Sequence, residues 1–519
     1  MFQTMESGIY LKLHQWQAEC LGLWAKNNYR GIVNAVTGSG KTVLALSAVR
    51  RLHEAAGQDL RIKIVVPQTF LAYQWKDEIK RQLGAASSDI GLYCGKRKDI
   101  GRKYMIYVIN SARHSLARHI LSELSSGRAV FLIADECHHY GSVENNRIFD
   151  FLKAAGTNAQ YYALGLSATP EIVNFNDITT PLGPEIYYYN FDRALRERII
   201  SRFILFSVRL DFTEYERDEY EQLSERISLS LRLLMKKRPE LRGMASGRFF
   251  AQLHSLTAQE SEISELAQTV LNLTYSRKTL CHMAAERPFC ALAIVNALPE
   301  QSRVILFCER IQSAETLYEA LSKRYPKQAG LYHSKMAEHS RQHVLDDFKV
   351  GALRLLVCCR ALDEGLNIPS TDAGIIVSTS MSARQRVQRL GRMLRRSKSI
   401  KQIYYLYIDG SSEDRELVFG LNAIGSTVPL ITLSYLGGAF IHTEYERLRE
   451  NVLEHVFHRR RDPALLGALD KNLDLALLRG DFLLSETICR ENFSKARSIR
   501  ERNYWASVLY VILMRLGKL

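Results

Sequence analysis

The chain has 519 residues, of which 46% are hydrophobic and 24% are charged, and its formal net charge is +15. This length exceeds one compact core, and 11 Pro with 30 Gly are too few for long disordered tracts. Two or three folded units are therefore expected, and a largely disordered protein is excluded. The excess of positive charge favours a polyanionic partner, because neutralised phosphates release condensed counterions.

The cysteines and the apolar segments bear on the compartment. Nine cysteines occur without a C-x-x-C pair, which fits neither a disulfide framework nor a zinc ribbon and is typical of a reducing, cytoplasmic setting. Residues 1–10 lack a basic stretch leading into an apolar run, so no secretory signal is expected. Between Leu417 and Thr443 no Asp, Glu, Lys or Arg occurs, but Pro429 and Gly437 interrupt the apolar text. That segment predicts a buried connector rather than a membrane span, and no membrane partner.

The chain begins with short apolar runs, rich in Val, Ile and Tyr, that alternate with helical stretches. This alternation is typical of parallel strands joined by crossover helices. The expected strands of this first set are Gly31–Val36, Arg61–Val66, Tyr104–Ile109, Ala129–Ala134 and Tyr161–Leu166.

A helical pattern follows from residue 214 to residue 298. Its apolar residues recur at spacings of three and four, as in Leu223, Ile227, Leu231 and Leu234. We interpret the segment as a helical insertion that acts as a wedge or clamp, or simply as a packing hairpin. The basic cluster Lys236–Arg238 within it suits a phosphate backbone, although such clusters are more often a solvated helix face.

A second set of strands comes after the insertion. These strands are Arg303–Cys308, Ala329–His333, Leu353–Cys358, Gly374–Ser378 and Gln402–Ile408. Two such sets predict an α/β fold class with two tandem doubly wound parallel sheets.

The sequence after Asp409 is expected to form no further strands. From Tyr445 onward it is helical, and a small bundle is predicted from the apolar stripe Leu465, Leu466, Leu469, Leu473, Leu477 and Leu478. The predicted division is thus a first α/β domain over 1–213, the insertion over 214–298, a second α/β domain over 299–412, and an accessory or partner-docking region over 413–519.

The strongest local motif is Ala-Val-Thr-Gly-Ser-Gly-Lys-Thr at residues 35–42, between a strand and the apolar helix 43–49. This context is that of a phosphate-binding loop, in which glycines let backbone N–H groups face the phosphates of ATP. Lys41 would bridge the β and γ phosphates, and Thr42 would offer its hydroxyl to Mg²⁺. The predicted nucleotide contacts from this loop are Thr37, Gly38, Ser39, Gly40, Lys41 and Thr42.

A carboxylate pair, Asp135-Glu136, directly follows the apolar run 130–134 and is itself followed by Cys137 and His138. Taken alone, such a pair after a strand is often a helix cap. With a phosphate loop upstream, Asp135 instead suits the metal, and Glu136 suits positioning and polarising an attacking water.

These motifs, in this order, resemble the superfamily 2 helicases in the DExH branch, and the resemblance covers about residues 10–410. It implies that Trp16 and Gln17 lie at the adenine, and that His138, Ser167 and Thr169 couple hydrolysis to movement. The expected contacts to the nucleic-acid backbone are Pro67, Gln68, Thr69, Ser111, His333 and Ser334.

The resemblance extends to the second α/β set and implies RecA-like domains. Gly365 and Asn367 match a motif that senses nucleotide and backbone, although many members carry Asp where this chain has Asn367. Gln388 belongs to a basic motif whose Arg392 and Arg395 would act as arginine fingers on the γ-phosphate across an interdomain cleft.

The resemblance therefore implies an ATP-dependent motor on nucleic acid, with ATP and Mg²⁺ as cofactors. The closest likeness is to DNA helicases and translocases of repair, recombination, restriction or phage defence. DNA is the expected substrate and RNA the alternative, because phosphate contacts do not by themselves distinguish the two.

A different class of function is an ATP-gated clamp that recruits a nuclease or other protein partner through the C-terminal helices. No nuclease or metal constellation is evident in the sequence. The nearest candidate, His455 with His458 and Glu454, has the pattern of ordinary surface or core residues.

Overall fold

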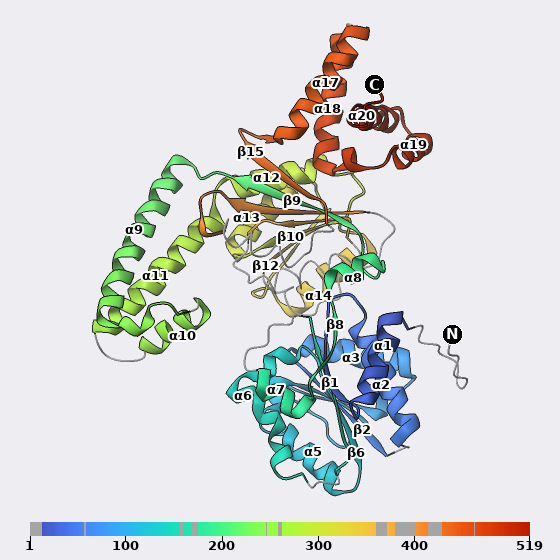
Figure 1. Ribbon diagram of the computed structural model, residues 1–519, viewed down its shortest axis with the longest axis vertical. Helices are drawn as coiled ribbons and strands as arrows, with labels where there is room; N and C mark the ends of the chain where they lie inside the picture. The colour runs from blue at the N-terminus through green and yellow to red at the C-terminus, as the bar shows by residue number, and fades with distance from the viewer. Residues whose placement is uncertain are drawn as a thin grey trace. The chain divides into compact units, whose positions relative to one another are not determined.

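The computed structural model describes residues 13–56, 59–155, 159–168, 175–244, 246–257, 262–359, 371–378, 400–413, 428–460 and 462–519. The chain divides into two compact units, and the described residues up to Arg202 lie in the first and those from Phe203 lie in the second. Figure 1 shows a sheet flanked by helices in each unit.

The first unit is built on an eight-stranded sheet in the order β4-β3-β5-β2-β6-β7-β1-β8. Every pairing in it is parallel except the short β3–β4 ribbon. Its strands are β1 (Arg30–Ala35), β2 (Leu60–Val66), β3 (Ile90–Cys94), β4 (Arg97–Lys98), β5 (Tyr104–Val108), β6 (Ala129–Ala134), β7 (Tyr161–Ser167) and β8 (Glu185–Tyr189).

Helices cover both faces of this sheet, as a doubly wound fold requires (Figure 1). They are α1 (Gln15–Lys26), α2 (Lys41–Ala56), α3 (Thr69–Leu83), α4 (Ile109–Ala112), α5 (Leu116–Ser125), α6 (Val143–Asn146), α7 (Phe175–Leu182) and α8 (Phe191–Arg196). The five strands expected here are confirmed within a residue or so at each end, whereas β3, β4 and β8 were not predicted.

The register of the central strands decides which motifs become neighbours. Asn34 of β1 lies opposite Ser167 of β7, Ala134 of β6 lies opposite Gly165 of β7, and Val65 of β2 lies opposite Ala134. Because the strands are parallel, the segments that follow them emerge along one edge of the sheet, where doubly wound folds bind ligands.

The second unit holds another eight-stranded sheet, in the order β11-β12-β10-β13-β14-β9-β15-β16. Only β15 and β16 pair antiparallel in it. The strands are β9 (Phe203–Leu210), β10 (Val304–Cys308), β11 (Ala329–Tyr332), β12 (Leu355–Cys359), β13 (Ala373–Ile376), β14 (Lys401–Ile408), β15 (Leu430–Leu436) and β16 (Ala439–Ile441).

Two expectations about this unit were wrong. The predicted first domain ran to residue 213, but β9 pairs along its whole length with β14 and therefore belongs to the second sheet. Strands were not expected after Asp409, but β15 adds in parallel to β9. Both strands are recognisable only through partners far away in sequence, so a local pattern cannot assign them.

Among the described residues, the helices of the second unit are an arm, a set on the sheet and a C-terminal group (Figure 1). A helical arm consists of α9 (Glu214–Lys237), α10 (Ser246–Leu256) and α11 (Glu262–Met283). The sheet carries α12 (Glu286–Ala297), α13 (Ile311–Arg324) and α14 (Glu338–Val350), and the C-terminal group is α17 (Thr443–Arg460), α18 (Pro463–Arg479), α19 (Glu486–Lys495) and α20 (Ile499–Arg515).

The helical insertion is confirmed, but it is shorter than predicted. Leu223, Ile227 and Leu234 are buried on the inner face of α9, as their spacing indicated. Helix α12, however, buries Cys290, Ala291 and related residues in the core of the second sheet rather than in the arm.

The C-terminal helices share that same core. Leu473, Leu477 and Val511 are buried together with residues of β9, β10 and β14. The Tyr404 hydroxyl of β14 donates to the Leu478 carbonyl at 2.5 Å, and Gly480 lies so close to β9 that an added Cβ would be 2.6 Å from the Ile204 side chain. The region after residue 443 therefore packs onto the second sheet, and its helices also form a small bundle with a core of their own around Cys489, Tyr504 and Val508.

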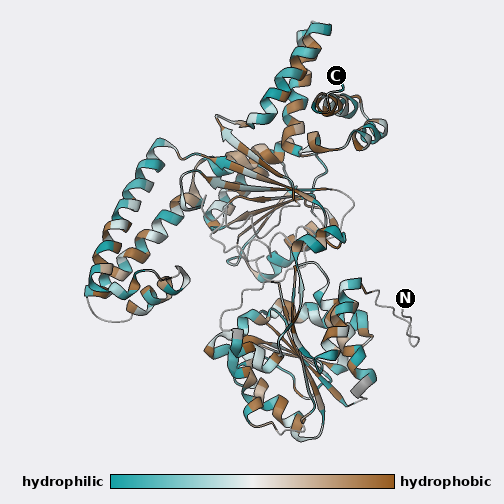
Figure 2. Cartoon of the chain, in the orientation of Figure 1, coloured by the Kyte–Doolittle hydropathy of each residue, from teal (hydrophilic) through white to brown (hydrophobic). Residues whose placement is uncertain are grey.

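Hydrophobic residues concentrate on the strands of both sheets, as Figure 2 shows. In the part of the chain that the structure describes, no helix combines the length and apolar character needed to cross a bilayer.

Candidate functional site

The loop at residues 35–42 adopts the curled backbone that its glycines predict. Gly38 and Gly40 have φ values of 85° and 97°, which residues with a Cβ rarely adopt. The Ser39 hydroxyl donates to the Val36 carbonyl at 2.7 Å and closes the turn, and α2 begins directly after it at Lys41. The N-terminus of a long helix thus follows a glycine-lined turn, an arrangement that binds phosphate.

The polar groups of this loop are arranged to receive a ligand. The Lys41 ammonium donates to the Ala35 carbonyl at 2.9 Å, so its side chain is folded back over the loop. The Thr37 hydroxyl oxygen and the Glu136 Oε2 atom are buried without a hydrogen-bond partner among the described residues. Buried polar atoms without partners are costly, and a nucleotide phosphate for Thr37 and a water molecule for Glu136 would supply partners here.

Gln17 supports the loop from the side. Its Nε2 donates to the Gly40 carbonyl at 3.0 Å, while its Oε1 accepts from the His14 N–H at 2.8 Å. A Cβ on Gly40 would lie 2.8 Å from that same Nε2. The expected contact of Gln17 with adenine would require this amide to exchange partners, so in this structure its role is to hold the loop.

Trp16 is packed rather than open. It is fully buried and its ring stacks on Tyr189 of β8 at 4.6 Å with the planes 15° apart. The aromatic packing between α1 and β8 therefore fixes the segment that carries Gln17.

Asp135 lies at the end of β6 and is buried. Its Oδ2 accepts from the Trp75 indole N–H at 2.8 Å. Burial, followed by the charge of Glu136, raises the pKa of Asp135 to about 6, against the lowering effects of the Trp75 hydrogen bond and the Lys41 charge. A carboxylate held with this desolvation cost gains from a nearby cation, which suits a metal ligand.

Glu136 occupies an unusual backbone conformation next to it. Its φ is 48°, in the left-handed region that residues other than glycine seldom enter. The Tyr140 hydroxyl donates to the Asp135 carbonyl at 2.7 Å and lies 3.0 Å from the Val65 carbonyl, which ties the turn to β2. Such strain concentrates at functional sites.

His138 links the carboxylate pair to the neighbouring strand. Its Nδ1 lies 3.5 Å from Glu136 Oε2 and 3.3 Å from the Ser167 hydroxyl at the end of β7. Two of the residues predicted to couple hydrolysis to movement, His138 and Ser167, are thus brought together, whereas Thr169 lies outside the described residues.

The predicted backbone contacts of the first unit follow neighbouring strands. Pro67 and Gln68 lie between β2 and α3, and Thr69 is exposed in the first turn of α3. Ser111 lies in the short helix after β5, where its hydroxyl accepts from the Gly95 N–H at 3.2 Å. These residues emerge at the same edge of the sheet as the phosphate loop.

In the second unit, His333 and Ser334 directly follow β11. His333 is buried and its Nε2 lies 3.5 Å from the Glu315 carboxylate, while Ser334 is exposed. The other predicted residues of this unit, Gly365, Asn367, Gln388, Arg392 and Arg395, lie outside the described residues, so their roles stay predictions.

Two parts of the chain match families of known proteins. Residues 10–172 match the family "Type III restriction enzyme, res subunit", and residues 289–397 match "Helicase conserved C-terminal domain". The chain belongs to the superfamily 2 helicases.

Individual relatives agree with this assignment. The helicase is 26% identical over 407 residues to the DNA 3'-5' translocase XPB2 of Sulfurisphaera tokodaii, covering 78% of this chain and 83% of the relative. It is 23% identical over 390 residues to the DNA 3'-5' helicase XPB of Kineococcus radiotolerans, covering 74% of this chain and 57% of that relative. The helicase thus spans little more than half the length of the second of these proteins.

A solved structure supports the fold. A fragment described as the HsdR subunit of a type I restriction enzyme from Vibrio vulnificus is similar with a TM-score of 0.51 and 14% identity, covering 82% of this chain and 69% of that chain. The predicted fold of tandem RecA-like domains is confirmed by the two mostly parallel sheets.

Several residues that shape the helicase site were not predicted. Trp75 binds Asp135, Tyr140 ties down the turn, and Tyr189 stacks on Trp16. Trp75 lies in an amphipathic helix, Tyr140 in a polar turn and Tyr189 in a strand that was not predicted. In such positions an aromatic residue is normally interpreted as part of the hydrophobic core. Only the tertiary contact shows that its polar atom or ring faces the site.

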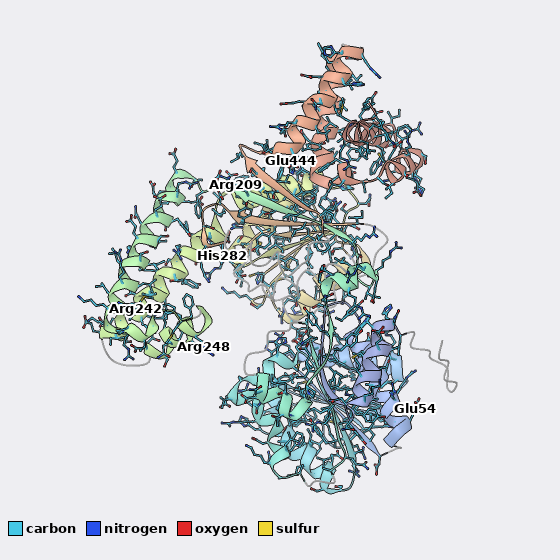
Figure 3. The ribbon with its side chains drawn as sticks, viewed as in Figure 1. Glu54, Arg209, Arg242, Arg248, His282 and Glu444 are labelled. Carbon is cyan, nitrogen blue, oxygen red and sulfur yellow. The ribbon has the colours of Figure 1, made fainter. Side chains whose placement is uncertain are left out.

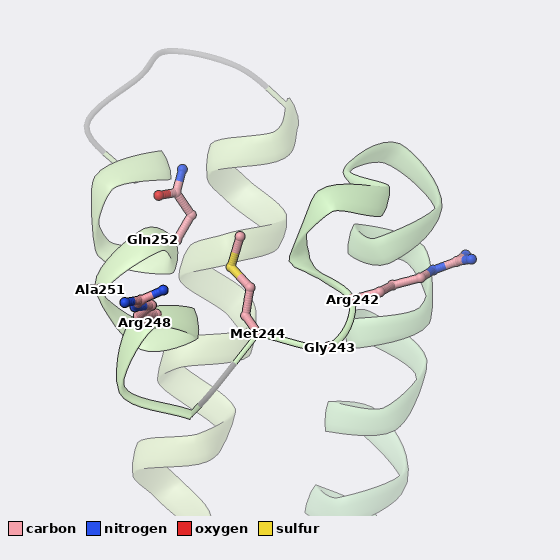
Figure 4. A pocket seen from close by; sticks show the side chains of 6 residues that line it. All are labelled: Arg242, Gly243, Met244, Arg248, Ala251 and Gln252. Atoms are coloured by element: carbon pink, nitrogen blue, oxygen red, sulfur yellow. The ribbon is translucent and has the colours of Figure 1, made fainter.

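The far end of the helical arm carries a basic surface. A hollow there is lined by Arg242, Gly243, Met244, Arg248, Ala251 and Gln252. Figure 3 labels Arg242 and Arg248 at the end of the arm away from the sheet, and Figure 4 shows Met244 between the turn and α10, with Arg242 pointing outward. The neighbouring cations Lys237 and Arg238 instead pair with Glu262 and Glu240.

Proposed function

We propose that this protein is an ATP-dependent DNA helicase or translocase that couples ATP hydrolysis to movement along DNA. The observation that carries the proposal is the convergence of the phosphate loop, the Asp135-Glu136 pair and the His138–Ser167 contact on adjacent strand ends of one sheet. The relatives named as DNA translocase and DNA helicase support DNA as the substrate. RNA remains the alternative substrate.

Each residue of the site has a role in this proposal. Lys41 and the backbone N–H groups of the loop bind the β and γ phosphates, and Thr42 with Asp135 holds Mg²⁺, which neutralises phosphate charge when bound. Glu136 orients the attacking water and accepts its proton. His138 and Ser167 pass the state of Glu136 to the next strand, because both contact it through one short chain of polar atoms.

The nucleic acid is bound through phosphates rather than bases. The strand-end residues Gln68, Thr69 and Ser111 of the first unit, with His333 and Ser334 of the second, offer hydroxyl, amide and imidazole groups suited to phosphate oxygens, and Pro67 lies in the same turn as Gln68. Contacts of this kind hold a strand without reading its sequence, as a motor that moves along any sequence requires.

The proposed pathway is DNA repair, restriction or antiviral defence. The match of residues 10–172 to a restriction-enzyme family supports this choice. A protein partner would bind the exposed side of α19 and α20, where Ile488, Phe493 and Ile499 are accessible, since α17 and α18 are largely used by the core of the second unit.

The proposal is tested by ATP hydrolysis with single-stranded DNA, duplex DNA, forked DNA and RNA. We expect stimulation of about tenfold or more by DNA, because closure of the site depends on the bound strand. Stimulation by RNA alone would overturn the choice of substrate. If the rate of ATP hydrolysis is the same with and without each polynucleotide, the proposal of a nucleic-acid motor is wrong.

The arginines at the end of the arm are expected to add affinity for DNA. Replacing both Arg242 and Arg248 with Ala should weaken binding to long DNA and reduce the slope of log affinity against log salt by about 2, since each lost phosphate contact removes about one unit. The measurement is fluorescence anisotropy across a salt series. The matched control is Arg226→Ala with Arg217→Ala, on the acidic half of α9, which should leave the slope unchanged.

A further inference from the structure

We propose that Arg287 and Arg310 form a clasp that joins the helical arm to the carboxyl-end edge of the second sheet, and that Arg310 is a positioning residue that makes the arm and this edge move as one body. The inference rests on the proposed function, because its consequence is the coupling of ATP hydrolysis to movement. Neither arginine belongs to a predicted motif.

Arg287 is the inner half of the clasp. It is fully buried at the start of α12, and a buried guanidinium is tolerated only when its donors are satisfied. Its Nε donates to the Cys281 carbonyl of α11 at 2.7 Å, and its Nη1 donates to the Val377 carbonyl after β13 and to the Leu406 carbonyl of β14. One side chain therefore connects the last turn of the arm to two strands.

A carboxylate completes the inner half. The Arg287 Nη2 pairs with Glu413, which also accepts from the Ile408 N–H at 3.2 Å. The turn that contains Glu413 contacts the first helix of the arm as well, because the Ser412 N–H donates to the Tyr220 hydroxyl of α9 at 3.0 Å. Both long helices of the arm are thus held by the turn that follows β14.

Arg310 is the outer half and lies between β10 and α13. Its guanidinium donates to the Tyr275 hydroxyl and, at 2.7 Å, to the Thr279 hydroxyl, both on α11. The guanidinium carbon also lies 4.3 Å from the centre of the Tyr275 ring, which adds a cation–π attraction. Arg310 is partly exposed, so its removal leaves no buried charge behind.

The arm is rigid enough to transmit a rotation of its base to its far end. It has hydrophobic clusters of its own between α9, α10 and α11, which include Leu234, Leu253 and Val270 near the far end and Leu223, Ile227 and Leu273 nearer the sheet. A helix of 22 residues spans about 33 Å at 1.5 Å per residue. A small rotation at the clasp therefore becomes a displacement of several ångströms at the arginine-lined hollow.

The clasp holds the carboxyl-end edge of the second sheet, where the predicted functional residues of this unit follow the strands. His333 follows β11 at this edge, and the segment after β13 leads in sequence to the predicted arginine motif. The Glu309 N–H, next to Arg310, donates to the Ser378 hydroxyl after β13 at 3.0 Å. Arg310 thus lies next to a residue that is hydrogen-bonded to the start of the segment leading in sequence to Arg392 and Arg395.

The first experiment measures the position of the arm directly. All nine cysteines are buried, so spin labels at Ala251→Cys on α10 and Gln342→Cys on α14 report the distance between the arm and the second sheet. We expect a single narrow distance distribution that broadens about twofold in Arg310→Gln, because the arm then rotates on the remaining contacts of Arg287 and Tyr220. An unchanged distribution would overturn the clasp.

The second experiment measures coupling. In Arg310→Gln we expect DNA affinity and DNA-stimulated ATPase within about twofold of the parent, and DNA translocated per ATP lowered about fivefold, in the range typical of coupling residues. Tyr275→Phe, which keeps the ring and removes the accepting hydroxyl, should give a smaller loss, and Arg226→Gln should give none.

The outcomes separate this inference from the proposed function. The positioning role is wrong if Arg310→Gln leaves the length of DNA translocated per ATP unchanged. It is also wrong if DNA affinity, DNA-stimulated ATPase and translocation per ATP all fall in parallel. Absence of DNA-stimulated ATPase and translocation in the parent protein would overturn the proposed function, whereas the distance measurement still tests the clasp.

Discussion

Glu136→Gln is expected to lower kcat for ATP hydrolysis by about 10²–10⁴-fold, the usual contribution of a general base, while ATP still binds. The carboxylate is at the end of β6, with its Oε2 buried and not hydrogen-bonded by any described residue. Gln preserves the size and one acceptor but cannot take a proton from water. The Lys41 ammonium and the loop that are proposed to bind phosphate are unchanged by the substitution.

The measurement is single-turnover hydrolysis together with nucleotide affinity from a fluorescent ATP analogue. Glu144→Gln, an exposed carboxylate in the next helix, serves as the matched control and should retain full activity. If Glu136→Gln hydrolyses ATP at the parental rate, the base lies elsewhere. If it fails to bind nucleotide, the residue has a structural role in the turn.

Removal of residues 445–519 is expected to unfold the second unit rather than to release a separable docking module. Leu473, Leu477 and Val511 belong to the core that contains Phe206 of β9 and Leu306 of β10. The Tyr445 hydroxyl donates to the Leu473 carbonyl at 2.8 Å inside this core. Deleting these helices would expose one face of the sheet to water, at a cost far above the marginal stability of a domain.

Thermal unfolding and limited proteolysis of the full-length and truncated proteins provide the measurement. Because a truncated chain can fail to express, two point substitutions test the same idea. Leu473→Ala should destabilise the second unit by about 2–5 kcal/mol. Leu465→Ala, at a site that is 43% exposed on the same helix, should cost no more than about 0.5 kcal/mol. A truncated chain with a native melting transition and intact ATPase would contradict this view and restore the detachable docking region.

The sequence and the structure therefore predict different results for this truncation. From the leucine spacing alone, a bundle with its own core is a sound interpretation, because an amphipathic stripe specifies that a face is buried and not what covers it. The structure places β9 and β14 beneath that stripe. The same reasoning applies to α12, whose apolar residues continue the helical pattern of the arm but pack on the sheet.

The motifs are the part of the site that could be predicted. The phosphate loop and the Asp135-Glu136 pair each depend on a short, continuous stretch of backbone between a strand and the segment after it, so their local conformation follows from local sequence. Parallel pairing then brings strand ends to one edge, which places His138 beside Ser167 although 29 residues separate them. The contacts of Trp75 and Gln17 could not be predicted, because each depends on where a helix docks.

By itself, the sequence determined the fold class, the order of the main strands, the helical arm and the local backbone of the proposed phosphate loop, since these follow from short-range periodicity and from motifs whose backbone requirements are local. The tertiary structure alone decided that β9 and β15 join the second sheet, that the C-terminal helices complete its core, and that Arg287 and Arg310 hold the arm. Strand partners, the covering of an apolar face and the satisfaction of a buried charge are all relations between segments distant in sequence. No local pattern contains them, because their free energy arises only when those segments meet.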